Sequence, residues 1–512
     1  MQKRKTAILL ALALSLATVF TACGGSSKDG SSQAKPEGQA DAGDQADATD
    51  QTDADGRTDA ESGRETDAAT ETAGSDAQDA QAIADKFHIE LKEVGSVRGK
   101  DDYKLTHGGL VHVEGENYTF CDLKGNIVDN RPLEDIAYLG WDLYSVTFRD
   151  DGEINSTGLV TAEGEVLIPF DAAIVTFPDE QTEDVRPRYI LVFTGTEETT
   201  NKDEALYYST DREYAFSPNE EDKFYKGFLR IFDLETREYV NGLECEKGYH
   251  YDFAQVGDNI LVKVGDKAVV YSPEGNPVYT EQTDLSYNSS YLLDKIDNKY
   301  VIMDADGNQL SASDTYTSIL DYNSDYFLLQ NNKKSVINAD GKPVLNSEWD
   351  TIYNENKDRF RVKNDGDTAD SLVTQDGSVI ASDSGVFAFD PLGFIGYGKS
   401  ENYTLITPGN RIIENLEDNS GKLFFTRDDK ASYLILNTGE FTSANGCDSR
   451  GVLTGVIALE NADHKFNLVD AFTGEELIGF KYDGVGYINN DYIYCEDGDD
   501  IVIYKVNIVP EY

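Results

Sequence analysis

Short runs of alternating apolar and polar residues recur along most of the chain. In the run YVIMDADGNQL, residues 300–310, β-branched and aromatic residues lead into an Asp-Gly turn, and a second short apolar run follows. Alternation with a period of two, interrupted by a turn glycine, predicts a β-hairpin. No stretch of comparable length has convincing helical periodicity. The pattern therefore predicts an all-β protein.

The hairpins form a repeat whose members share a turn glycine. From the third glycine onward the spacing between successive members is 32, 34, 36, 32, 30 and 35 residues. A tenth unit without the glycine fits at 229–240. A period in this range is typical of repeat architectures. The turn glycines are Gly125, Gly164, Gly275, Gly307, Gly341, Gly377, Gly409, Gly439 and Gly474.

Further short strands, such as 325–331 and 358–364, lie between the hairpins, so each repeat holds three or four strands. Antiparallel repeats hide their edges by closing into a ring, whereas an open stack needs caps. We therefore predict a β-propeller-like array of short antiparallel hairpins, with an open β-solenoid as the alternative. Ten units exceed the usual four to eight blades. The sequence leaves open whether some units share a blade or two rings form.

A closed ring needs a partner for its last strand. The final unit carries an extra apolar strand at 499–509, and the first unit has an early apolar strand at 108–113. We expect these two strands to pair.

One unit also resembles a known repeat. Residues 156–177, STGLVTAEGEVLIPFDAAIVTF, resemble the WG-repeat of many bacterial surface and exported proteins. The Trp-Gly pair that names the family is replaced here by Thr157-Gly158. The resemblance extends over most of residues 110–485 but is specific only in this unit. It implies a role in binding or scaffolding rather than catalysis.

The first 23 residues have the features of an export signal. Three basic residues at positions 3–5 precede an apolar run, 6–20, that is too short to span a bilayer comfortably. The tetrapeptide Phe20-Thr21-Ala22-Cys23 resembles the lipobox of bacterial lipoproteins, although Phe20 stands where Leu is usual. The resemblance implies that Cys23 is lipidated and becomes the first residue of the mature protein. The alternative is an ordinary secretory signal with a chance cysteine.

Composition divides the rest into a tether and a body. Residues 24–80 contain no aromatic residue and no Leu, Ile or Val, and carry a net charge of −11. Such a segment cannot bury enough surface to fold, so it is predicted to be a disordered tether. The body, residues 81–512, has a net charge of −43. This charge excludes nucleic acid and anionic lipid as direct partners.

The stretch GFIGYGKS, residues 393–400, matches the phosphate-loop pattern G-x-x-x-x-G-K-[ST]. That motif needs a helix after the loop, because the helix N-terminus supplies the amides that hold the phosphates. Residues 401–413 instead form another strand and turn of the repeat, and an exported protein meets no pool of triphosphates. We predict that the stretch is an inter-strand connection, that no nucleotide binds, and that Lys399 is dispensable.

Motifs for other chemistry are absent from the sequence. It contains no H-E-x-x-H, C-x-x-C or G-x-S-x-G, and we assign no catalytic, cofactor or metal residue. A calcium site at 496–500, EDGDD, stays open as a candidate. Four cysteines of the body allow three disulfide connectivities, although two of them, Cys121 and Cys495, lie among strand residues, as buried free thiols do. The four are Cys121, Cys245, Cys447 and Cys495.

The leading hypothesis is an exported, lipid-anchored cell-surface protein whose repeat body binds a protein or glycan or acts as a scaffold. It contacts the membrane only through the lipid on Cys23. The alternatives are an extracellular propeller enzyme of carbohydrate or peptide turnover, and an envelope-assembly or sensor component. A charged, Tyr-rich stretch at 194–227 breaks the repeat. It is either a binding-face insertion or a degenerate blade with a long loop.

Overall fold

The computed structural model describes residues 84–511, and the body, Ile83–Tyr512, forms a compact unit of its own. The predicted signal peptide, Cys23 and the tether lie outside the described residues. Further gaps are 107, 149–155, 173, 178–185, 200–206, 209–223, 242, 244, 247–249, 265–266, 282–284, 322–325, 346, 357, 384–387, 400–401, 420–421 and 428–431.

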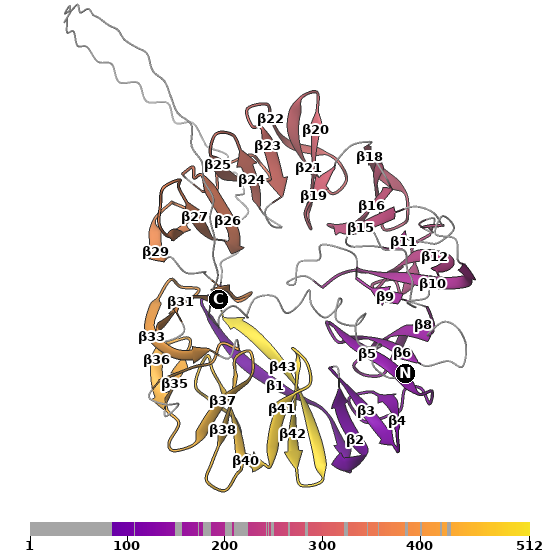
Figure 1. The fold of residues 1–512 in the computed structure, drawn as a ribbon, viewed down its shortest axis with the longest axis vertical. Coiled ribbons are helices and arrows are strands. Elements are labelled where there is room, and N and C mark those ends of the chain that lie inside the picture. Colours follow the sequence, from indigo (N-terminus) through magenta and orange to yellow (C-terminus); the bar gives the residue numbers. More distant parts are fainter. Residues whose placement is uncertain are drawn as a thin grey trace, which may run out of the picture. The chain divides into compact units, whose positions relative to one another are not determined.

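The described chain folds into eleven small sheets that follow one another around a ring, an eleven-bladed β-propeller (Figure 1). Except for β11, the strands within each sheet pair in antiparallel fashion. We number the blades in chain order.

Blades 1 to 4 contain the following strands. Blade 1 has β2 (Tyr103–Thr106), β3 (Gly109–Glu114) and β4 (Asn117–Cys121). Blade 2 has β5 (Leu133–Gly140), β6 (Leu143–Phe148), β7 (Ser156–Thr161) and β8 (Val166–Ala172). Blade 3 has β9 (Ile174–Thr176), β10 (Tyr189–Thr199), β12 (Phe224–Asp233), β13 (Glu238–Tyr239) and β14 (Cys245–Glu246). Blade 4 has β15 (His250–Val256), β16 (Asn259–Val264), β17 (Lys267–Tyr271) and β18 (Pro277–Glu281), with β11 (Tyr207–Tyr208) paired to β15.

Blades 5 to 8 continue the ring. Blade 5 has β19 (Ser286–Tyr287), β20 (Tyr291–Ile296), β21 (Lys299–Asp304) and β22 (Gln309–Ser313). Blade 6 has β23 (Ser318–Asp321), β24 (Tyr326–Gln330) and β25 (Lys334–Asn338). Blade 7 has β26 (Thr351–Asn356), β27 (Arg359–Lys363), β28 (Asp370–Thr374) and β29 (Val379–Asp383). Blade 8 has β30 (Ala388–Phe389), β31 (Ile395–Lys399), β32 (Asn402–Ile406) and the first half of β33 (Ile412–Asn419).

Blades 9 to 11 complete it. Blade 9 has the second half of β33 with β34 (Phe425–Arg427), β35 (Ser432–Ile435) and β36 (Glu440–Ser443). Blade 10 has β37 (Asp448–Leu453), β38 (Val456–Glu460), β39 (Phe466–Asp470) and β40 (Glu476–Tyr482). Blade 11 has β41 (Gly484–Tyr487), β42 (Tyr492–Asp497), β43 (Asp500–Glu511) and β1 (Lys86–Arg98). The short 3-10 helix η1 (Lys100–Asp102) links β1 to β2.

The turn after the third strand of a blade explains why the repeat was visible in the sequence. In blade 5 the Asp304 carbonyl accepts a hydrogen bond from Gly307 N–H, and its carboxylate accepts from the N–H groups of Asp306 and Asn308, at 3.0 and 2.8 Å. Gly307 has a φ of 83°, in the left-handed region that glycine adopts without steric cost. The turn is therefore fixed by a few neighbouring residues.

Eight of the nine turn glycines have a positive φ, and in blade 8 Asn410 takes that place instead of Gly409. The ten sequence units correspond to blades 1 to 10, one unit to each blade. The eleventh blade has no such unit because its fourth strand comes from the other end of the chain. The all-β propeller prediction is confirmed, and the open solenoid alternative is wrong.

The C-terminal strand closes the ring, but not with the partner that the sequence suggested. The predicted partner, 108–113, lies in β3, between β2 and β4 of blade 1. β43 pairs instead with β1 along its whole length, from Lys86↔Glu511 to Arg98↔Asp500. The apolar alternation of β1 is interrupted by a register shift between Glu93 and Gly95. That interruption hides the strand from a period-two search.

β1 and β43 extend beyond the blade that they complete. β42 pairs with β43 only as far as Lys505, so residues 506–511 pair with residues 86–91 alone. We call this two-stranded extension, 86–91 with 506–511, the closing ribbon. Figure 1 shows β1 and β43 side by side, running inward from blade 11.

The closing ribbon is held by the neighbouring blades. Ile89 N–H donates to the Asp470 carboxylate of blade 10 at 2.9 Å. Phe87 exchanges two hydrogen bonds with the Asn437 side chain of blade 9, at 3.1 and 2.7 Å, and its ring packs against Phe394 of blade 8. The closing ribbon therefore connects four blades, 8 to 11, and does not only cover the edge of one sheet.

The structure also locates two segments noted in the sequence, the phosphate-loop-like stretch 393–400 and the charged stretch 194–227. In GFIGYGKS, Gly393 has a φ of 90° in the turn before β31, and β31 pairs with β32, so a strand and not a helix follows the loop, as predicted. The charged stretch 194–227 falls in the long strands β10 and β12 and their connection, which contributes β11 to blade 4. The described part of this stretch therefore contributes strands to two neighbouring blades, 3 and 4.

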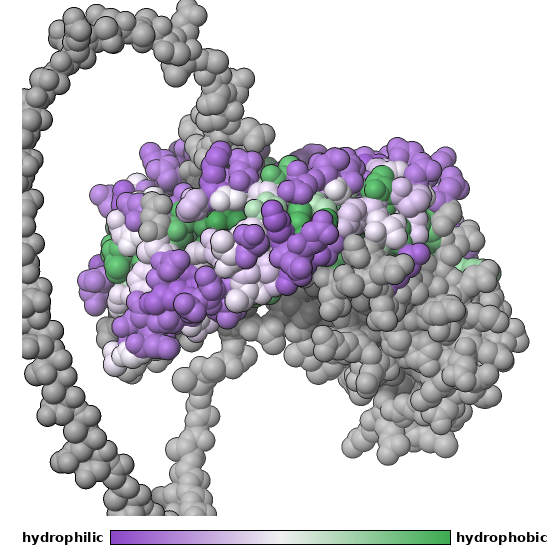
Figure 2. Space-filling model, turned by 90° about the horizontal axis from the view of Figure 1, so that it is seen from above, coloured by the Kyte–Doolittle hydropathy of each residue, from purple (hydrophilic) through white to green (hydrophobic). Residues whose placement is uncertain are grey.

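The visible rim in Figure 2 is mostly hydrophilic, with hydrophobic residues in narrow bands between polar ones. Several of the exposed apolar residues lie on or beside fourth strands, among them Val166, Val278, Leu310 and Val379. Within the described part of the chain, no helix is long and apolar enough to cross a bilayer.

Candidate functional site

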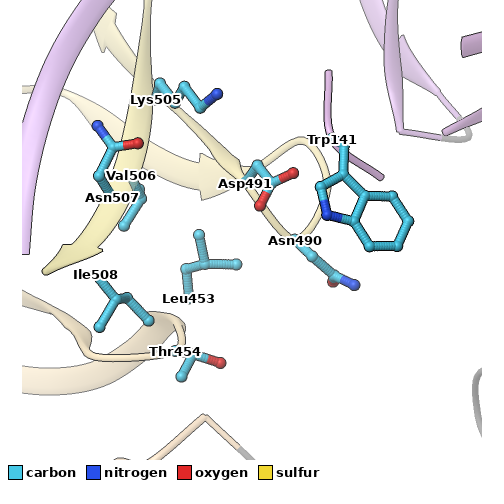
Figure 3. A pocket seen from close by; sticks show the side chains of 9 residues that line it. All are labelled: Trp141, Leu453, Thr454, Asn490, Asp491, Lys505, Val506, Asn507 and Ile508. Carbon is cyan, nitrogen blue, oxygen red and sulfur yellow. The ribbon is translucent and has the colours of Figure 1, made fainter. Parts of the chain in front are cut away.

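An open pocket of about 340 Å³ lies beside the closing ribbon. Four segments that are far apart in the sequence line it: the β5–β6 turn, the β37–β38 turn, the β41–β42 turn and β43 (Figure 3). Its lining residues are Trp141, Leu453, Thr454, Asn490, Asp491, Lys505, Val506, Asn507 and Ile508.

Trp141 projects from a tight turn in blade 2. Gly140 pairs with Leu143, and the two residues between them, Trp141 and Asp142, both have positive φ, 50° and 64°. Such a two-residue turn normally uses Asn and Gly, because larger side chains are strained there. The indole packs nearly perpendicular to the Phe177 ring, with an interplanar angle of 80° and ring centroids 5.5 Å apart. The turn therefore holds a large aromatic side chain in a fixed position at the pocket.

Asp142 connects blade 2 to blade 11. One carboxylate oxygen accepts a hydrogen bond from Tyr492 Oη at 2.5 Å, and the other lies 2.5 Å from Lys505 Nζ. Burial, followed by the hydrogen bond to Asp142, raises the pKa of Tyr492, so its hydroxyl stays a donor. The negative charge of Asp142 is thus already neutralised by the positive charge of Lys505.

Asp491, in the β41–β42 turn of blade 11, also connects to blade 2 and to β43. Its carboxylate accepts a hydrogen bond from the Tyr138 hydroxyl, and its backbone carbonyl accepts from Val506 N–H at 2.9 Å. Burial and the neighbouring Asp491 charge raise the pKa of Tyr138. The adjacent Asn489 donates to the Gly108 carbonyl of blade 1 at 2.8 Å. Blades 1, 2 and 11 are therefore locked together beneath the pocket.

The remaining lining side chains make fewer hydrogen bonds within the protein. Leu453, Val506 and Ile508 supply an apolar wall. Among the hydrogen bonds between described residues, none involves the side-chain amides of Asn490 and Asn507 or the indole N–H of Trp141. In Figure 3, Trp141 and the β43 residues stand at opposite ends of the lining. The pocket thus offers one aromatic surface, one apolar wall and two amides.

Among the described residues, none of the candidate site residues selected from the sequence lines the pocket. Cys23 is outside the described residues. Lys399 ends β31, in blade 8. In the 496–500 segment, Glu496 lies 3.0 Å from Lys100 and Asp497 lies 2.9 Å from Lys481, so both acids are paired with cations. Across the described ranges, no group of three or more His, Cys, Asp or Glu side chains is arranged to hold a metal ion.

The described cysteines are free thiols. Cys121 and Cys495 are buried, as the sequence suggested, and Cys447 is half-buried. Burial raises the pKa of Cys121 to about 11 and that of Cys495 to about 12, so neither forms a thiolate readily. The side chain of Cys245 is outside the described structure.

Sequence reasoning missed the pocket. A signal for part of it exists in the turn after the first strand of two blades, YNSSY at 287–291 and INNDY at 488–492. In both turns the Asn carboxamide oxygen accepts hydrogen bonds from the backbone N–H groups two and three residues later. The shared Asn-x-x-Tyr pattern marks these turns. It does not show which turns meet.

Comparison with known proteins names no family. No family model matches the chain, and no curated protein matches it. Among solved structures, a eukaryotic initiation factor aligns at 11% identity over 76% of this chain and 96% of that one, with a TM-score of 0.35.

BamB from Moraxella catarrhalis aligns at 9% identity over 81% of this chain and 100% of its own, with a TM-score of 0.23. The computationally designed Ika8 protein aligns at 11% identity over 61% and 98%, with a TM-score of 0.25. At these scores the likenesses carry no conclusion about function.

Proposed function

We propose that the chain is an exported, lipid-anchored cell-surface protein whose propeller body is a binding or scaffold module. The observation that carries the binding role is the state of two carboxylates, Asp491 in the pocket lining and Asp142 beside it. The Asp142 carboxylate is paired with Lys505 and accepts a hydrogen bond from Tyr492, and the Asp491 carboxylate accepts one from Tyr138. A carboxylate that serves as a general acid or base must reach the substrate proton directly or through one water. These two are engaged in joining blades.

The pocket is instead suited to holding a ligand. Its aromatic and apolar groups offer contact area, and its amides offer donors and acceptors, which is the usual composition of a binding site. The groups around it are fixed by hydrogen bonds from three blades, so little freedom is lost when a ligand binds. Export and anchoring rest on the N-terminal sequence, in particular on the lipobox-like residues before Cys23.

Binding without turnover tests the proposed role of the body. Residues 81–512 contain the closing strands and every described core cluster, so they can be made alone. Immobilised body is exposed to a glycan array and to a panel of purified exported proteins. We expect saturable binding of at least one glycan or protein, recovered unchanged by mass spectrometry. Cleavage of the bound molecule would favour the extracellular enzyme instead, and no binding at all would refute the proposal.

Cell fractionation tests the anchor. We expect Cys23→Ala to move the protein from the membrane fraction to the soluble fraction or the medium, because the lipid is its only contact with the membrane. Cys447→Ala, which removes a different cysteine, serves as the control and should stay membrane-bound. A Cys23→Ala protein that remains fully in the membrane fraction would refute the anchoring model.

A further inference from the structure

We propose that the pocket around Trp141 binds one or two rings of a neutral glycan. The inference rests on the proposed binding role of the body and assigns that role a site and a ligand class. It starts from the indole of Trp141, which a strained two-residue turn and a nearly perpendicular ring contact with Phe177 hold in place. A sugar ring presents a face of C–H groups, which packs against the flat, electron-rich face of an indole.

The polar part of the pocket matches the rest of a sugar. Hydroxyl groups both donate and accept hydrogen bonds, and the carboxamides of Asn490 and Asn507 do the same. Thr454 adds a hydroxyl, and no hydrogen bond between described residues uses its side chain. Leu453 and Ile508 line the same pocket and would exclude water from the apolar side of a ring.

Charge narrows the class of glycan. The pocket lining contains one acid, Asp491, and one cation, Lys505, which is already neutralised by Asp142 outside the lining. The body as a whole carries a net charge of −43. Sulfated or uronic sugars would meet a like-charged surface with no free cation in the pocket, so a neutral sugar is favoured.

Size limits the length that the pocket holds. Its volume of about 340 Å³ is at the small end of ligand sites, which span about 300–1,000 Å³. The pocket is also partly open to solvent. A longer glycan would therefore enter with one or two rings and leave the rest of its chain outside.

The test uses the small number of tryptophans. The chain has two, Trp141 and Trp349, so Trp349→Phe leaves the pocket residue as the only tryptophan. The Trp349→Phe body is titrated with tetrasaccharides of N-acetylglucosamine, β-1,4-linked glucose and mannose, and with trigalacturonate as the anionic probe. We expect a saturable change in Trp141 fluorescence with at least one neutral tetrasaccharide and none with trigalacturonate.

Calorimetry on variants then assigns the site. We expect Trp141→Ala to weaken binding at least tenfold and Asn490→Ala threefold or more, whereas Phe480→Ala, an exposed aromatic of blade 10, changes nothing. Asn490 is exposed, so its variant remains informative if Trp141→Ala fails to fold.

Several results would overturn the inference. They are the absence of neutral glycan binding, binding of the anionic probe alone, and glycan binding that Trp141→Ala and Asn490→Ala leave unchanged. The last result places the glycan elsewhere and leaves the proposed binding module standing. If neither the glycan array nor the protein panel shows binding, the proposed function is refuted as well.

Discussion

At the scale of single residues, Arg359 is the most deeply buried charge of the described body, with an exposed side-chain fraction of 0%. It starts β27 in blade 7 and reaches into blade 8, where its guanidinium donates to the Thr407 carbonyl at 3.1 Å and the Gly393 carbonyl at 2.6 Å. Its Nε lies 3.1 Å from the Asp358 carboxylate. One side chain thus satisfies backbone carbonyls of the next blade.

Removing this side chain tests its structural role. We expect Arg359→Leu to lower the free energy of unfolding by about 3 kcal/mol, because it leaves buried carbonyls and Asp358 without their partner. Urea denaturation followed by circular dichroism measures the change. Lys342→Ala, at an exposed turn, is the control and should change stability by less than about 0.5 kcal/mol. Equal stabilities for the two variants would show that Arg359 contributes little.

Lys399 gives a second prediction at this scale. It ends a strand that another strand follows, so no helix N-terminus is available to hold phosphates. We expect no heat when ATP–Mg is titrated calorimetrically into residues 81–512. Wild type and Lys399→Ala should behave alike. Micromolar binding that Lys399→Ala abolishes would show that the loop is a nucleotide site after all.

At the scale of elements, the pairing of β1 with β43 gives the ring its closure. The two strands join residues 86–98 to residues 500–511, and the closing ribbon also contacts blades 8 to 10. In an open array each repeat contacts only its neighbours, so loss of an end is a local event. In this ring the same loss exposes two edges at once.

Truncation distinguishes these cases. We expect deletion of residues 499–512 to remove hydrogen-exchange protection from residues 86–98 as well as from blade 11, and to lower it in blades 8 to 10. Deletion of residues 511–512 alone, beyond most of the pairing, is the control. Protection that persists in 86–98 after the longer deletion would contradict the observed closure.

At the scale of the whole molecule, net charge is the dominant property. The full chain carries a formal charge of −51 at pH 7 and the body alone −43. Self-repulsion at this charge destabilises a compact state and is screened by salt. The mostly hydrophilic rim in Figure 2 is consistent with a body that resists self-association.

A salt series tests this property. We expect the Tm of residues 81–512 to rise as sodium chloride increases from 10 to 150 mM, because the screening length falls from about 30 to about 8 Å. Calcium chloride and magnesium chloride at matched ionic strength should give equal shifts. A distinctly larger rise with calcium would instead reveal a specific site, for which the acidic turn at 496–500 is the first candidate to mutate.

The sequence by itself determined the local features. A turn such as Asp304 to Gly307 is specified by neighbouring residues, because the side chain that caps it and the glycine that permits it are three positions apart. Nine turn glycines and a tenth unit without one predicted the β-class and the repeat, and the ten units correspond to ten of the eleven blades. Their even spacing also favoured a ring, since closure removes the edges that hairpins expose.

Tertiary structure alone decided the closure and the pocket. Alternating apolar residues tell which face of a strand is buried but not which strand lies beside it, so 108–113 was as eligible a partner for the last strand as β1. Gly95 shows what the sequence could not: a Cβ there would lie 2.0 Å from the Leu123 carbonyl oxygen, a contact across two blades. Trp141, Asn490 and Asn507 line one pocket only because the ring brings distant turns and the last strand together. Their proximity depends on the geometry of the whole molecule, which no local pattern encodes.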